Sequence, residues 1–157
     1  MSNRYNFLYF EAEFKKYLIA GNAGASTIKN YLSDLHFFFS WLKNENGISD
    51  LDCSSMPELF TVTLIRSFYH SITSSANSQN TSTRRLATLR KFFSFCIAQR
   101  WLRSNPAVEH LANKKEDVRE EVVNSYSLFL KSTHGETPDI DRHIKVIRDL
   151  VINSSIL

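Results

Sequence analysis

Residues 78–107 read SQNTSTRRLATLRKFFSFCIAQRWLRSNPA, and this stretch decides the fold because it is typical of one long amphipathic helix. Apolar residues recur along it at spacings of three and four, which places them on one face. They are Leu86, Leu89, Phe93, Cys96 and Ile97, with Phe92 at the edge of the face. The helical region ends at Asn105-Pro106, because the residue before a proline disfavours the α conformation. We therefore expect a helix that packs on its neighbours through this face.

The positive charge of this region has no nearby acidic residue to balance it. Between Glu58 and Glu109 the chain contains seven cations and no acid. The cations are Arg66, Arg84, Arg85, Arg90, Lys91, Arg100 and Arg103. Residues 1–50 hold five charges of each sign and residues 111–157 hold seven basic and eight acidic ones, so the net charge of +3 arises in the middle third. This excess predicts an anionic partner, and a phosphate backbone is the first candidate.

The polar side of the same helix is the predicted contact face. It starts with Thr81 near the helix N-terminus, where the helix dipole favours an anion. It continues with Arg84, Ala87, Thr88, Lys91, Phe95 and Ala98, of which Ala87 and Thr88 are small enough to permit the close approach of a large ligand. Arg90 lies nearer the apolar face, so we expect it to form a structural ion pair, with Asp34 as its partner.

Composition predicts a helical, globular chain. Its 157 residues are 43% hydrophobic and 13% aromatic with only three Pro and four Gly, which argues against disorder and against a turn-rich β fold. The free cysteines Cys53 and Cys96 and the five scattered histidines have no metal-ligand spacing, so we expect no metal and no cofactor. Because no signal peptide or 18-residue apolar run is present, we expect a cytoplasmic protein without membrane contact.

Three helices precede the basic one. The first should run from Arg4 to Ala20, and the third should be capped by Thr61 after a loop over residues 48–60. The second should begin at Ser26 as its N-cap and end near Gly47. Its polar face comprises Ser26, Lys29, Asn30, Ser33, Phe37 and Ser40, so Phe37 is a single aromatic on a polar surface. This Phe either packs against another segment or belongs to a partner surface.

The C-terminal part is balanced in charge and reads as a separate unit. Residues 111–117 are predicted to form a linker or an exposed helix start. One helix should end near Gly135, and Thr137-Pro138 should open another. We therefore divide the chain into a domain over residues 1–110, a linker over 111–117, and an incomplete second domain over 118–157.

Two motifs resemble the tyrosine recombinases, also called phage integrases. STIKNYLSDL from Ser26 to Leu35, followed by Phe38, Trp41 and Leu42, is similar to the family pattern T-x3-Y-x2-D-L-x2-F-x2-[FW]-L. RRLATLRKFF from Arg84 to Phe93, with Asn105-Pro106-Ala107 downstream, is similar to the family's R-R-L-x2-L-R-x-[FY]-[FY] and N-P-A signature. The match covers about residues 7–107 and keeps both the order and the spacing.

The resemblance implies the family's N-terminal core-binding domain, an all-α, four-helix SAM-like bundle. In that family this domain forms one arm of a clamp on double-stranded DNA, and its second and fourth helices cross the major groove. The implied DNA contacts are Lys29, Asn30 and Ser33 on the second helix and Thr81, Arg84, Arg85, Thr88 and Lys91 on the fourth. Other recombinase protomers on the same DNA are a further implied partner.

The resemblance assigns no catalytic residue to this chain. The family's nucleophilic tyrosine and its Arg, Lys and His residues belong to a C-terminal catalytic domain, of which residues 116–157 resemble the first two helices. We expect the chain to stop near the first catalytic arginine, and none of its six tyrosines matches the nucleophile. The function expected is therefore DNA binding for recombination or integration, without an enzymatic activity of its own.

One alternative from another class stays open. The chain could be an all-helical protein-interaction module in which Phe37 and Phe95 are the anchors and the basic face only confers solubility. Packing of both aromatics within the chain is the reading we favour.

Overall fold

The structure is a computed structural model that describes residues 4–74 and 79–153. Over these residues it contains seven helices and one two-stranded sheet, so the predicted all-α class is confirmed. The chain divides into two compact units, Met1–His110 and Leu111–Leu157. Ser78, the predicted start of the basic helix, lies outside the described residues.

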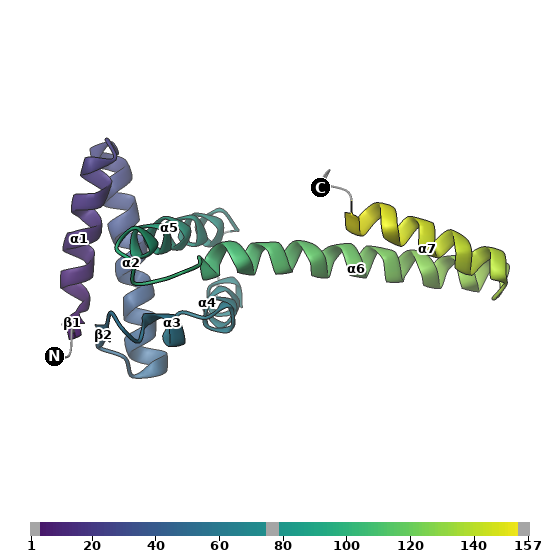
Figure 1. The fold of residues 1–157 in the computed structure, drawn as a ribbon, viewed down its shortest axis with the longest axis horizontal. Helices are drawn as coiled ribbons and strands as arrows, with labels where there is room; N and C mark the ends of the chain where they lie inside the picture. Colours follow the sequence, from purple (N-terminus) through teal and green to yellow (C-terminus); the bar gives the residue numbers. More distant parts are fainter. Residues whose placement is uncertain (1–3, 75–78, 154–157) are drawn as a thin grey trace. The chain divides into compact units, whose positions relative to one another are not determined.

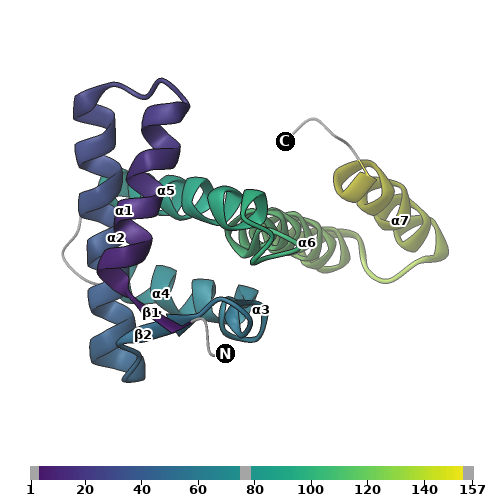
Figure 2. The same cartoon turned by 60° about the vertical axis from the view of Figure 1, so that its left-hand side comes forward.

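A helical hairpin begins the first unit. Helices α1 (Phe7–Ala20) and α2 (Ala25–Asn46) lie side by side, as Figures 1 and 2 show. The turn between them is closed by the backbone N–H groups of Gly21 and Ala23, which donate to the carbonyls of Tyr17 (3.0 Å) and Leu18 (3.1 Å). The predicted N-cap of α2 is wrong: Gly24 occupies that position, and Ser26 lies in the first helical turn.

The chain before α1 is a short strand. β1 (Arg4–Asn6) pairs antiparallel with β2 (Asp50–Asp52), and Tyr5 lies opposite Leu51. The prediction that α1 starts at Arg4 is therefore wrong. Asn6 caps the helix instead, since its Oδ1 accepts the N–H of Tyr9 at 3.1 Å. The predicted loop over residues 48–60 contains β2 and the short helix α3 (Met56–Leu59).

Helix α4 (Val62–Ser74) follows and begins as predicted. The Thr61 hydroxyl accepts the N–H of Leu64 at 3.2 Å, which confirms Thr61 as the cap. Its buried residues Ile65 and Phe68 face the rest of the unit.

The basic helix α5 (Gln79–Ala98) is shorter than predicted. It ends before Arg100, which adopts the left-handed conformation (φ 62°) and turns the chain back. Trp101 then packs edge-on against Phe95, with ring centroids 5.4 Å apart. Pro106 opens the next helix, α6 (Pro106–His134), rather than ending a helical region. Asn105 caps it, because its Oδ1 accepts the N–H of Ala107 at 3.2 Å.

Helix α5 runs across the α1–α2 hairpin and packs on more than one side (Figures 1 and 2). Phe92 meets Phe14 of α1 at 5.5 Å and Phe39 of α2 at 5.6 Å between ring centroids. Phe93 meets Phe60 at 5.1 Å. The prediction of a single apolar face is therefore too narrow. Residues expected on the polar side are buried too: Phe95 and Thr88 are each 1% exposed.

The second unit contains most of α6, followed by α7 (Pro138–Asn153). Residues 111–117, predicted as a linker or an exposed helix start, lie within α6. Gly135, in the left-handed conformation (φ 76°), ends α6 where predicted. Arg148 of α7 lies 3.6 Å from the Glu120 carboxylate of α6. Within the described part of the chain, no helix combines the length and hydropathy needed to cross a membrane.

Replacing Phe92 with Ala should destabilise the first unit by about 3–5 kcal/mol, because it removes a fully buried ring that joins three helices. Urea denaturation followed by circular dichroism measures this. Leu8→Ala is the control: Leu8 lies on α1 and is 67% exposed, so its loss should change the stability by less than about 0.5 kcal/mol. Equal effects of the two substitutions would contradict the assignment of Phe92 to the core.

Candidate nucleic-acid interface

Two neighbouring helices, α2 and α5, carry the predicted contact residues. On α2, the side chains of Lys29, Asn30 and Ser33 are exposed, in the first three turns of the helix. They share a surface because residues three and four apart lie on the same side of a helix. The structure therefore exposes these three predicted residues to solvent. Among the described residues, Lys29 forms no ion pair.

On α5, Arg84 is exposed but not free. Its Nη2 donates to Oδ1 of Asp34 at 2.8 Å, and the Thr88 hydroxyl donates to Oδ2 of the same carboxylate at 3.1 Å. Asp34 is only 3% exposed, whereas the Arg84 side chain is 51% exposed. The carboxylate thus lies between α2 and α5 with both oxygens satisfied, and it holds the guanidinium at the rim of the helix junction.

Two predictions about this junction are wrong. The partner of Asp34 is Arg84 and not Arg90, because six residues of helix turn Arg90 about 240° away from Arg84. The backbone carbonyl of Arg90 accepts instead from the Asn105 amide at 2.9 Å. Thr88 does not point outward either: four residues from Arg84, it lies on the same side and is buried against Asp34.

Arg85 stacks on the exposed aromatic of α2. Its guanidinium carbon lies 3.5 Å from the centroid of the Phe37 ring. Nε and Nη1 are buried without a hydrogen-bond partner among the described residues. Burial lowers the pKa of the Arg85 guanidinium from its ordinary value, and the nearby Asp34 partly offsets this. The structure therefore turns much of this predicted contact residue toward protein, and Phe37 packs within the chain as favoured.

Lys91 is exposed on the same side of α5 as Arg84, because seven residues return a helix to within about 20° of the starting direction. Its Nζ lies 5.4 Å from the centroid of the Tyr17 ring of α1. Thr81, a further turn toward the N-terminus, is partly exposed. Arg84 and Lys91 are thus the exposed cations of the predicted stripe on α5.

Two hollows lie along this surface. The smaller, about 200 Å³, is lined by Asn30, Asp34, Arg84 and Thr88 together with Thr27, Tyr31 and Ala87. The larger, about 440 Å³, contains Lys91 and is also lined by Tyr17, Thr27 and Tyr31. The sequence did not predict Tyr17 and Tyr31 as site residues, because their helical spacing is that of core residues. Only the packing of α1 on α5 brings Tyr17 close to Lys91.

The chemistry of this surface is that of binding to an anion. Its exposed charges are the cations Lys29, Arg84 and Lys91, and its acid, Asp34, is buried and paired. Within residues 4–74 and 79–153, no group of three or more His, Cys, Asp and Glu side chains could hold a metal ion.

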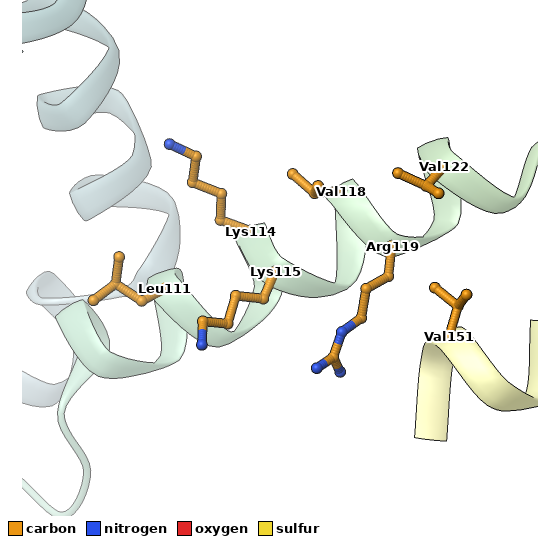
Figure 3. Close-up of a pocket in the computed structure, with 7 residues that line it drawn as sticks. All are labelled: Leu111, Lys114, Lys115, Val118, Arg119, Val122 and Val151. Atoms are coloured by element: carbon orange, nitrogen blue, oxygen red, sulfur yellow. The ribbon is translucent and has the colours of Figure 1, made fainter. Parts of the chain in front are cut away.

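A third hollow, about 380 Å³, lies in the second unit and is mainly apolar. Figure 3 shows Val122 of α6 above Val151 of α7, and the Arg119 side chain extends from α6 beside the end of α7. Arg119 Nη1 donates to the carbonyl of Ile152 at 3.3 Å. None of the predicted DNA-contact residues lines this hollow.

Two Asp–Arg pairs of nearly equal length test the role of Asp34. Asp34→Ala should lower the free energy of unfolding by about 1–3 kcal/mol, less than for a fully buried pair because Arg84 is half exposed. Asp50→Ala removes the exposed pair with Arg4, 2.9 Å long, and should cost less than about 1 kcal/mol. Urea denaturation compares them; a larger loss for Asp50→Ala would refute a structural role for Asp34.

Comparison with known proteins places this surface in a family. Residues 12–100 match the family model of the phage integrase N-terminal SAM-like domain, which includes all of α2, α4 and α5. No curated protein and no solved structure matches the chain. The family match covers more than half of the 157 residues and contains the motif of residues 26–42 and the RRLATLRKFF motif of residues 84–93. The chain therefore belongs to the phage integrase family of tyrosine recombinases, by way of its N-terminal SAM-like domain.

Proposed function

We propose that residues 1–110 form the core-binding domain of a site-specific recombinase and bind double-stranded DNA at a recombination site. In this proposal, helices α2 and α5 cross the major groove, whose width admits an α-helix. This arrangement serves recombination or integration by holding the DNA, and other protomers on the same DNA are its natural partners.

One observation carries this proposal: the exposed cations of α2 and α5 share a surface whose acidic residue, Asp34, is buried. Asp34 is 3% exposed and forms a neutral pair with Arg84, so the net positive charge of the surface comes from Lys29 and Lys91. The phosphate backbone supplies most of the affinity of such a surface, and base contacts supply specificity.

The contact residues have different roles within this proposal. Lys29 and Lys91 are exposed ends of flexible side chains and suit phosphate contacts. Arg84 is held by Asp34, which orients a guanidinium whose remaining donors face solvent. Asn30 and Ser33 are neutral and exposed on α2, where an amide or a hydroxyl can meet a base edge or a phosphate. Thr81, which is partly exposed, extends the surface toward the N-terminus of α5. Arg85 lies against Phe37 at the edge of the surface, and Thr88 supports the surface from inside through Asp34.

We assign residues 118–157 to the start of the catalytic domain, and residues 111–117 to the helical connection before it. The chain then binds DNA and leaves strand cleavage to catalytic residues that it does not itself contain.

The competing function, a protein-interaction module, has less support. It needs Phe37 and Phe95 as anchors, but Phe95 is 1% exposed and the Phe37 ring is covered on one side by Arg85. A module of this kind would bind duplex DNA only as tightly as expected for a protein with the same net charge.

Salt dependence tests the proposed interface. Lys91→Ala and Lys29→Ala should each weaken binding to a labelled duplex and reduce the slope of log Kd against log salt by about 0.9, because each removes about one phosphate contact. Fluorescence anisotropy at a series of NaCl concentrations measures both. Lys15→Ala is the control, since this exposed lysine lies about 200° around α1 from Tyr17.

Only the contact lysines should change the slope. If Lys15→Ala reduced it as much as Lys91→Ala, the charge would act as a diffuse field and the placement of the contact surface on α2 and α5 would be wrong.

The division between binding and chemistry has its own test. Supercoiled plasmid incubated with the chain should be retarded in a gel at low salt, yet return to the supercoiled form after protein removal. Nicked or relaxed plasmid that is absent from a control incubation without protein would contradict the assignment of cleavage to other residues.

A further inference from the structure

The larger hollow of the first unit lies where the α1–α2 turn meets α5. Its volume is about 440 Å³, and small residues of the turn form one wall. The chemically active groups around it are the ammonium of Lys91 and the hydroxyls of Tyr17, Tyr31 and Thr27. The hollow therefore combines one cation and three hydroxyls in a space larger than a phosphate group needs.

Lys91 has no carboxylate partner within the described residues. Its Nζ lies 5.4 Å from the Tyr17 ring centroid, a distance at which the aromatic face attracts an ammonium. This contact draws the side chain toward α1. The charge is thereby directed over the hollow.

The two tyrosines are held by their rings and not by their hydroxyls. The Tyr17 ring packs against Phe95 at 5.3 Å, and the Tyr31 ring packs against Phe14 at 6.3 Å. Among the described residues, neither phenolic hydroxyl has a hydrogen-bond partner. Two fixed rings thus carry donors that a ligand oxygen could use without displacing a protein contact.

The smaller hollow continues this arrangement along α5. Both hollows are lined by Thr27 and Tyr31, and the smaller one contains Arg84. Seven residues separate Arg84 from Lys91, which corresponds to about 10.5 Å along the helix. The two cations are therefore far enough apart to serve different phosphates of one strand.

The geometry points to a phosphodiester site in the larger hollow, in which Lys91 binds one DNA backbone phosphate and the hydroxyls of Tyr17 and Tyr31 donate to its oxygens. This inference rests on the proposed function and adds helix α1 to the contact surface. A phosphodiester fits because it presents a single negative charge and two unesterified oxygens, which match one ammonium and two hydroxyl donors among the lining residues.

Removal of single hydroxyls tests the site. Tyr17→Phe and Tyr31→Phe keep the rings and should each raise Kd for a labelled duplex of mixed sequence roughly 3- to 10-fold. The salt slope should stay unchanged, because a hydroxyl releases no counterion. Tyr5→Phe is the matched control: Tyr5 is partly exposed on β1, outside both hollows, and its loss of a hydroxyl should leave Kd unchanged.

A double variant tests whether the groups share one phosphate. Tyr31→Phe combined with Lys91→Ala should weaken binding less than the product of the two single effects, because both groups serve the same ligand. Equal thermal denaturation of all variants ensures that only binding is compared.

The outcomes separate this site from the proposed function. Failure of the unaltered chain to bind duplex at low salt would overturn both. The phosphodiester site alone would be overturned if the chain binds duplex DNA and the Kd values of Tyr17→Phe and Tyr31→Phe equal that of Tyr5→Phe. Inorganic phosphate titrated in place of the duplex adds a further arm: if it shifts the tyrosine ring resonances while the substitutions leave duplex affinity unchanged, the hollow takes free phosphate and the backbone site is wrong.

Discussion

The packing of Phe92 and its neighbour Phe93 in the middle of α5 is the interaction on which the first unit depends. Through these rings α5 meets α1, α2 and the segment before α4, so one helix supplies the centre of the core. Burial of each ring contributes about 1.5–3 kcal/mol. Because α5 packs against several elements, eight of its twenty residues are buried, and its exposed cations are confined to the strip that carries Arg84 and Lys91.

This confinement explains how a helix can be both core and contact surface. Two of the polar side chains that α5 buries are satisfied by neighbouring helices: the Thr88 hydroxyl donates to Asp34 of α2, and the Ser82 hydroxyl donates to the Ile72 carbonyl of α4 at 3.3 Å. The buried carboxylate joins α2 to α5 and removes the acid from the surface. Because its pair with Arg84 is neutral, the net positive charge on which DNA binding is proposed to depend comes from the exposed Lys29 and Lys91.

The second unit follows a different design. Its helices α6 and α7 expose large apolar side chains, including Leu128 (72%), Leu150 (61%) and Phe129 (60%). Two helices alone cannot bury such residues on all sides. This agrees with the proposal that residues 118–157 begin a larger domain. The first unit has an aromatic core, whereas the second unit does not.

The sequence by itself determined the helical class, the ends of α1, α2 and α6, the Thr61 cap, the basic character of α5 and the family, because periodicity, capping residues and local charge are properties of neighbouring residues. Only the tertiary structure decided which cation pairs with Asp34, why Thr88 is buried, and that Tyr17 meets Lys91. These contacts join residues about 50 or more positions apart. They depend on how each helix is rotated about its axis when several faces pack at once, and periodicity that assumes a single buried face cannot supply that rotation.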